Sequence, residues 1–126
     1  MATSDRDAEP PFLEPGSATI ADFERLDLRV GRVLEAAPLE GARRPAYRLR
    51  IDFGAAGQRS SSAQLTRSYP DPSALVGRPV VAVVNFPPRR VAGSRSDVLV
   101  LGALAGDGRI PLLSPDREAE PGQRIG

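Results

Sequence analysis

Residues 47–53 read YRLRIDF, in which apolar and charged side chains alternate without exception. Successive side chains of a β-strand point to opposite faces, so this pattern predicts a half-buried strand. The chain continues with GAAG and then with the polar segment QRSSSAQL. A glycine-rich loop between two extended segments favours a hairpin, and we therefore expect residues 58–65 to form the partner strand.

Other short apolar segments recur along the chain. LDLRVGRV alternates and then slips phase at Gly31, which predicts a bulge or sharp bend of the kind that lets strands curl into a small barrel. A short helix follows, capped by Asp71 and started by Pro72. Residues 80–86 and 97–104 predict two further buried strands, and RIPLL predicts an extra edge strand.

This order of elements predicts an all-β fold. A five-stranded OB-fold barrel, with a short helix between strands three and four, has the same arrangement. N- and C-terminal extensions complete the predicted chain, and other small Greek-key barrels remain open as alternatives. We assign the barrel core to six aliphatic residues, namely Leu49, Ile51, Val81, Val83, Leu99 and Leu101.

The first 18 residues differ in composition from the rest. Residues 1–18 are acidic and rich in proline, which predicts a mobile tail in front of a single domain at residues 19–126. The start of the chain lacks the apolar run of a secretory signal. The apolar run at residues 80–84 is too short to span a membrane. We therefore expect a cytoplasmic protein that does not contact membranes.

Positive charge is concentrated in the centre of the chain. Residues 41–96 contain ten arginines and two acidic residues, a net charge of +8, whereas residues 1–24 have a net charge of −5. A basic centre in a chain of net charge +1 indicates an anionic partner, with a merely solvated surface as the alternative. All 17 basic residues are arginine, which favours forked contacts to phosphate.

The residue types that the chain lacks argue against catalysis. It contains no cysteine, histidine or lysine, so residues 60–62, three consecutive serines, have no histidine or lysine to activate them as nucleophiles. Asp52, Asp71 and Asp97 are not clustered as metal ligands would be. We expect no enzymatic activity, no catalytic residue, no metal site and no cofactor.

Between two of the predicted strands the chain reads NFPPRRVAGSRSD. Proline has no amide hydrogen, so Pro87-Pro88 ends strand pairing and holds Arg89 and Arg90 on a stiff, extended backbone. Gly93 then lets the chain turn back. A stiff support lowers the entropy that the arginines lose when they bind an anion, and a plain connection with solvated arginines is the alternative.

Several segments together resemble the CsaA-type family of tRNA-binding proteins, which are related to the tRNA-binding domain of some bacterial methionyl-tRNA synthetases. The resemblance covers about residues 19–126. It implies an OB-fold homodimer that binds tRNA without catalysis, and chaperone-like binding of unfolded or exported polypeptides is the alternative. Arginine replaces the lysines of the family pattern, Asp97 replaces a glutamate, and the acidic tail is additional. The segments are DFERLDLRVGRV, IDFG, SSAQLT, VVAVVNFPPRRVAG and SDVLVLG.

The resemblance also implies RNA-binding residues. Arg89 and Arg90 are the leading candidates for phosphate contact. Asn85 either contacts a sugar or base edge or bonds the backbone of the turn. The remaining polar candidates either contact RNA or form hydrogen bonds within the barrel, and they are Ser61, Ser62, Gln64 and Ser96. A wider basic patch comprises Arg43, Arg44, Arg48, Arg50 and Arg95.

The aromatic residues indicate the kind of RNA. The chain has six of them, and alternation places Tyr47, Phe53 and Phe86 in the core. Phe23 is expected to face inward. Few rings then remain to stack on bases, which favours structured RNA over single strands.

Two apolar segments lie outside the barrel order. One is a helical turn after the capping-box-like Thr19, with Ile20 and Phe23 on a face that we expect to pack on the protein body. The other is residues 110–113. If two copies meet through these segments, they form the homodimer that the resemblance implies. If both segments fold back onto their own barrel, the protein is a monomer.

Overall fold

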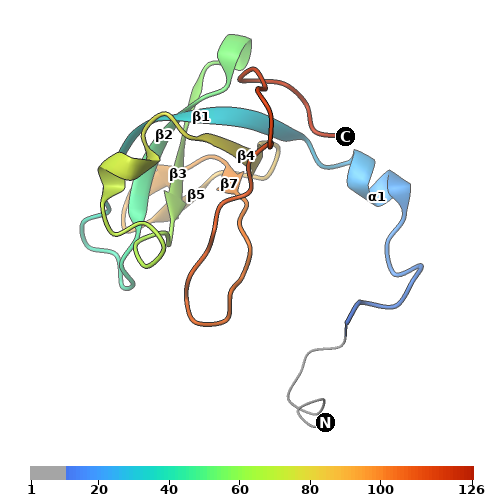
Figure 1. Cartoon of the computed structure of the whole chain (residues 1–126), viewed down its shortest axis with the longest axis horizontal. Helices are drawn as coiled ribbons and strands as arrows, with labels where there is room; N and C mark the ends of the chain where they lie inside the picture. The colour runs from blue at the N-terminus through green and yellow to red at the C-terminus, as the bar shows by residue number, and fades with distance from the viewer. Residues whose placement is uncertain (1–10) are drawn as a thin grey trace, which may run out of the picture.

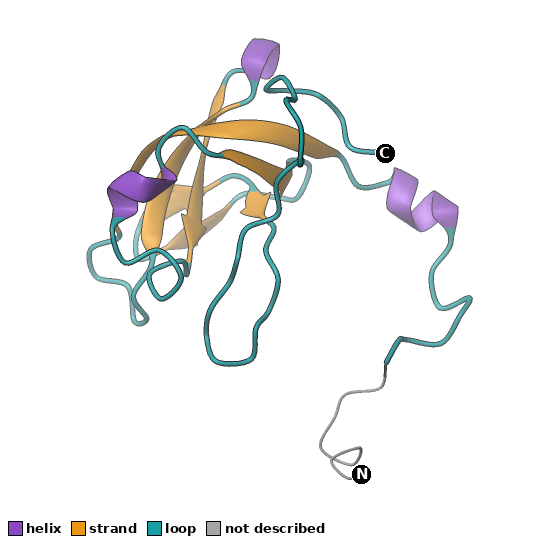
Figure 2. Cartoon of the chain, viewed as in Figure 1, coloured by secondary structure: helices purple, strands orange, loops and turns teal. Residues whose placement is uncertain are grey.

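Five strands curl around an apolar core in the computed structural model, which describes residues 11–126 (Figure 1). All neighbouring pairs are antiparallel, and the sheet order is β3-β2-β1-β4-β7. The structure has little helix (Figure 2). This confirms the predicted all-β, five-stranded OB-fold barrel. The strands are β1 (Leu28–Pro38), β2 (Tyr47–Asp52), β3 (Gln58–Ala63), β4 (Pro79–Val83) and β7 (Leu99–Val100).

The predicted helix between strands three and four is the 3₁₀-helix η3 (Pro72–Leu75). The Asp71 carboxylate accepts hydrogen bonds from the Ser73 amide at 3.0 Å and from the Ser73 hydroxyl at 2.8 Å, which caps the helix as predicted. Leu75 anchors η3 in the core. A second 3₁₀-helix, η2 (Gly54–Ala56), joins β2 to β3.

Strand β1 pairs with two partners in succession. Residues 28–32 pair with β4, and residues 32–38 pair with β2. The phase slip predicted at Gly31 is present, since Val30 and Val33 are both buried, but the bulge lies between Val33 and Glu35, where the register shifts. Gly31 has a different role, since a Cβ atom there would lie 2.5 Å from the Ile51 side chain. Its missing side chain lets the core residues of β2 pass close to β1.

The core follows the predicted alternation in β2, where every second side chain is buried. Val81 and Val83 are buried as predicted, but in a second core cluster with Leu28, against which the partly buried Leu101 packs. The prediction fails at Leu99. Leu99 is 41% exposed and Val98 is buried instead. The main core comprises Val33, Tyr47, Leu49, Ile51, Phe53, Leu65, Leu75, Val80, Ala82 and Val98.

Hydrogen bonds to β3 determine which side chains of the last strand face the core. The amides of Asp97 and Val98 both donate to the Ser60 carbonyl, at 2.8 and 3.4 Å. This anchor turns Val98 inward, and a shift of one residue exchanges the two faces of a strand. Leu99 therefore faces outward.

The C-terminal segment covers the remaining edge of β1. The Val30 amide donates to the Gln123 carbonyl at 2.9 Å, and the Ile125 amide donates to the Leu28 carbonyl at 2.9 Å. The predicted edge strand at residues 110–113 is present as a short antiparallel pairing rather than a full strand. Gly102 and Leu112 form a bridge, the Ala103 amide donates to the Pro111 carbonyl at 2.8 Å, and the Leu113 amide donates to the Leu101 carbonyl at 3.1 Å. Pro111 has no amide to extend this pairing.

The helix α1 (Ile20–Glu24) has the predicted capping box, in which the Thr19 hydroxyl accepts from the Asp22 amide. Its predicted packing on the body is wrong. Ile20 is 75% exposed and Phe23 is 41% exposed, and α1 stands away from the barrel (Figure 1). Among the helices of residues 11–126, none combines the length and apolarity needed to cross a bilayer.

The predicted tail is only partly covered by the structure. Residues 1–10 lie outside the described residues, and residues 11–18 are exposed and belong to neither helix nor strand. The predicted domain boundary after residue 18 stays a prediction.

Candidate nucleic-acid interface

A short hairpin follows the two prolines. It consists of β5 (Arg89–Val91) and β6 (Ser94–Ser96), which pair antiparallel. Its two-residue turn has positive φ angles, 50° at Ala92 and 78° at Gly93, as type I′ turns require. The predicted reversal at Gly93 is confirmed, although the sequence analysis did not predict the pairing itself.

The register of the hairpin separates the two arginines of PPRR. Arg89 lies opposite Ser96, and Arg90 lies opposite Arg95, so Arg89 and Arg90 point to different faces. Arg90 donates to the Gly93 carbonyl at 3.0 Å, and Arg95 forms an ion pair with Asp97 at 2.5 Å. Like charges opposite each other are unfavourable, and a bound phosphate would relieve this repulsion between Arg90 and Arg95.

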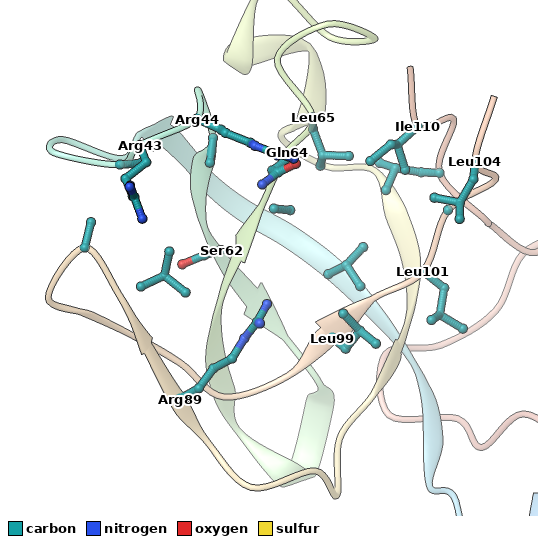
Figure 3. A pocket seen from close by; sticks show the side chains of 18 of the residues that line it. Arg43, Arg44, Ser62, Gln64, Leu65, Arg89, Leu99, Leu101, Leu104 and Ile110 are labelled. Atoms are coloured by element: carbon teal, nitrogen blue, oxygen red, sulfur yellow. The ribbon is translucent and has the colours of Figure 1, made fainter. Parts of the chain in front are cut away.

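Arg89 extends into a cavity of about 820 Å³ between the hairpin, β3, the loop before β2 and residues 99–112 (Figure 3). Basic and polar side chains line one side, and apolar side chains line the opposite side. Within residues 11–126 no cluster of three metal-ligating side chains occurs. The polar side comprises Arg43, Arg44, Ser62, Gln64 and Arg89, and the apolar side comprises Leu99, Leu101, Leu104 and Ile110.

The polar residues of β3 divide between the core and the cavity. Ser61 lies opposite the core residue Leu49, and its hydroxyl donates to the Val98 carbonyl at 2.9 Å. Ser96 is also buried, and its hydroxyl accepts from the Ser62 amide at 3.0 Å. Burial and hydrogen bonding favour framework roles for Ser61 and Ser96.

The other two polar candidates face the cavity. Ser62 belongs to β3, Gln64 follows that strand, and both residues line the cavity. Within the described part of the chain, the buried Ser62 hydroxyl oxygen has no hydrogen-bond partner. Leaving a buried polar atom without a partner costs free energy.

Both ends of the Asn85 amide are bonded to the backbone. Its Oδ1 accepts from the Asp27 amide at 2.9 Å, and its Nδ2 donates to the Arg25 carbonyl at 2.8 Å. These bonds tie the end of β4 to the segment before β1. They favour the structural alternative for Asn85 over direct contact with RNA.

Phe86 is a site candidate that the sequence analysis missed. It was predicted to lie in the core, which is wrong, because the residue is 42% exposed. Strand β4 ends at Val83, so alternation no longer determines where Phe86 points. The ring borders a smaller cavity of about 190 Å³ together with Arg89 and Leu99. An exposed ring beside an arginine suits stacking on a nucleic-acid base.

Asp97 fastens the hairpin to the barrel. The hydrogen bond from Arg95 is the main reason that the pKa of Asp97 lies below its ordinary value, and the Ser60 amide contributes a further hydrogen bond at 3.3 Å. Burial opposes this effect but does not reverse it. The ionised carboxylate therefore stabilises the position of β6 beside β3.

The "Putative tRNA binding domain" family matches residues 28–124, a range that contains all five strands of the barrel. The chain belongs to this tRNA-binding domain family. It is 36% identical over 117 residues to the methionine–tRNA ligase of Xanthomonas oryzae and 36% identical over 118 residues to that of Xylella fastidiosa. These alignments cover 93% and 94% of this chain but only 17% of each ligase.

Two solved structures are also similar to this chain. The chaperone CsaA of Bacillus anthracis is 48% identical with a TM-score of 0.79, covering 86% of this chain and 98% of that one. The CsaA chaperone protein of Picrophilus torridus is 43% identical with a TM-score of 0.80, covering 86% and 99%. The predicted resemblance is confirmed, and this chain is a CsaA-type member of the tRNA-binding family.

Replacing Asp97 is expected to change how stability depends on pH. Folding lowers the pKa of Asp97, so its ionised form stabilises the native state above the ordinary value of 3.8, and this contribution is lost as the pH falls through the lowered pKa. Urea unfolding between pH 7 and about pH 3 should show a smaller loss of unfolding free energy for Asp97→Asn than for the wild type. Asp116→Asn, at an exposed site, is the control. Equal pH dependence in Asp97→Asn and the wild type would contradict the assignment.

Proposed function

We propose that this protein binds tRNA, without catalysing a reaction, through the polar side of the large cavity and the outer face of the hairpin. The observation that carries the proposal is the position of Arg89, which extends from a proline-supported hairpin into a cavity that Arg43 and Arg44 also line. Because tRNA acts in translation, we place this function in the cytoplasm.

Three guanidinium groups around one cavity suit a phosphate backbone. Each can donate two parallel hydrogen bonds to a phosphate, and such charge-assisted bonds are stronger than neutral ones. Arg90 and Arg95 on the outer face extend the same positive surface. The exposed Phe86 adds a stacking surface, so a folded RNA that also presents unpaired bases fits this surface better than a uniform duplex.

Arg89→Ala is expected to weaken tRNA binding by about 1–3 kcal/mol, or roughly 5- to 150-fold, because it removes a charge-assisted contact. Arg89→Lys should restore part of this loss if the contact is forked. Filter binding at fixed salt measures the change. Arg117→Ala, which removes an exposed arginine away from the cavity, is the matched control and should bind as the wild type does.

Salt dependence gives the same experiment a second readout. If about four phosphates are neutralised, log affinity should fall with log salt at a slope of roughly −3 to −4, and Arg89→Ala should reduce the slope by about 0.9. An unchanged affinity and slope in Arg89→Ala would show that RNA does not bind at this cavity.

Binding of unfolded polypeptide is the second candidate function. The apolar side of the cavity favours it, because Leu104 is 86% exposed and Leu99, which lines the same cavity, is 41% exposed. Two similar structures are described as CsaA chaperones. In this mode Leu104→Ser would lower binding of an unfolded protein, whereas Arg89→Ala would have little effect.

We also propose that two copies form a homodimer through α1 and residues 110–113. Ile20, Phe23 and Leu113 are large apolar side chains exposed in the single chain. A second copy that covered them would remove this apolar surface from water. It would also present two basic surfaces to one RNA, which raises apparent affinity through effective concentration.

Sedimentation at micromolar concentration is expected to give twice the chain mass of 13.4 kDa. The paired change Ile20→Ser and Phe23→Ser should shift the population toward monomer, because it removes apolar surface from the interface. Val76→Ser changes an exposed apolar side chain elsewhere and serves as the control. A wild-type species at 13.4 kDa alone would rule out the dimer.

A further inference from the structure

The smaller cavity adjoins the large one beside the hairpin. It lies between residues 86–89 and residues 96–99, and Arg89 and Leu99 line both cavities. Its volume of about 190 Å³ is smaller than the roughly 300–1,000 Å³ of pockets that enclose a drug-sized ligand. A space of this size suits one flat ring better than a whole nucleotide.

An aromatic ring lines this small cavity. Phe86 is 42% exposed and precedes Pro87, which also lines the cavity. A proline restricts the backbone of the residue before it, so the ring is carried on a stiff support and loses little entropy when a ligand binds. Because every base has a π-face, stacking on Phe86 would hold a base without selecting which one.

The carboxylate of Asp97 adds a group that can select a base. Asp97 lines the small cavity, and its side chain is 19% exposed. The hydrogen bond from Arg95 is the main cause that keeps the pKa of Asp97 below its ordinary value of 3.8, so the carboxylate is ionised at neutral pH and only accepts hydrogen bonds. An ionised carboxylate has about four acceptor sites, and Arg95 and the Ser60 amide use two of them. The others are available to an N–H group of a ligand.

The two pyrimidines of RNA differ at the group that a carboxylate reads. Cytosine carries an amino group, N4, that donates a hydrogen bond, whereas uracil carries a carbonyl oxygen, O4, at the same position. Aspartate and glutamate accept from cytosine N4 in nucleic-acid recognition. Uracil O4 would instead place one acceptor against another. A purine has a second ring and needs more room than a pyrimidine.

We propose that the small cavity binds one unpaired cytosine of a bound RNA, with its ring stacked on Phe86 and its amino group donating to Asp97. A base is joined to its phosphate through a single sugar, so the phosphate of this cytosine would lie near Arg89, which lines both cavities. This assignment rests on the proposed function, because it takes RNA as the ligand. It adds a preference for one base to a surface that otherwise selects phosphate.

Oligocytidylate and oligouridylate of equal length test the preference on the full chain. The two probes carry the same number of phosphates and differ only in the pairing edge of the base, so their charge does not distinguish them. In fluorescence anisotropy at fixed salt, oligocytidylate should bind about tenfold more tightly, the change expected for one hydrogen bond to a charged group. Equal affinity, or tighter binding of oligouridylate, would overturn the proposal.

The stacking contact is tested by Phe86→Leu, which keeps an apolar side chain and removes the ring. This variant should bind oligocytidylate about 5- to 150-fold more weakly than the wild type, the range measured for the loss of one stacked base. Phe12→Leu removes an exposed ring that lines neither cavity and should bind as the wild type does. Wild-type affinity in Phe86→Leu would overturn the stacking.

The reading by Asp97 is tested by the ratio of the two affinities. Asp97→Asn should bring this ratio close to one, because an asparagine amide donates to uracil O4 as well as it accepts from cytosine N4. Asp97 also fastens the hairpin, so Arg95→Gln is the matched control. It removes the Arg95–Asp97 ion pair but leaves the carboxylate, and the preference for cytosine should persist. Loss of the preference in Arg95→Gln as well would assign it to the position of the hairpin and overturn the role of Asp97.

The outcomes separate this proposal from the proposed function. Binding of tRNA that Arg89→Ala weakens, without a preference for oligocytidylate, would leave the proposed function standing and overturn the cytosine site. A preference for oligocytidylate without binding of tRNA would support the cytosine site and contradict tRNA as the partner. If neither the oligonucleotides nor tRNA bound, both proposals would be overturned.

Discussion

The barrel depends on strand β1, which pairs with β4 along its first half and with β2 along its second half. As a result, β2 and β4, which lie far apart in the sequence, are both hydrogen-bonded to the same strand. The close passage of β2 requires that residue 31 carry no side chain, because Ile51 and Phe53 fill the space where a Cβ atom would lie. The C-terminal segment then occupies the edge of β1 that neither β2 nor β4 covers.

The candidate site depends on how this barrel closes. Its last strand is held to β3 by hydrogen bonds that involve Ser60, Ser61 and Ser62. These bonds place the β5–β6 hairpin beside β3, and Arg89 is thereby directed into the cavity. As a consequence, the two serines of the SSAQ segment have different roles. Ser61 holds the framework, whereas Ser62 faces the space where a ligand would lie.

Features that depend on neighbouring residues were predictable from the sequence. The alternation of residues 47–53, the cap of η3 by Asp71 and the reversal at Gly93 are local consequences of residue type and spacing. The strand order followed from these elements, and the resemblance directed attention to Arg89. Strand register would also have separated Ser61 from Ser62, since Ser61 falls opposite the core residue Leu49.

Features set by distant contacts were not predictable. The outward direction of Leu99 follows from the bonds of Asp97 and Val98 to Ser60, which lies 37 residues earlier. Asn85 could be assigned to the backbone only once Arg25 and Asp27 were seen beside it. The exposed position of α1 also depends on contacts that helical periodicity does not reveal.

The proposed function requires that RNA contact the basic cavity and leave the other faces of the barrel free. Arginine-specific chemical modification, read by mass spectrometry with and without tRNA, tests this requirement on every basic residue of the chain, because all of them are arginines. We predict that tRNA protects Arg43, Arg44 and Arg89, and that Arg32 and Arg117 stay reactive. Protection of Arg117 with Arg89 still reactive would contradict the account.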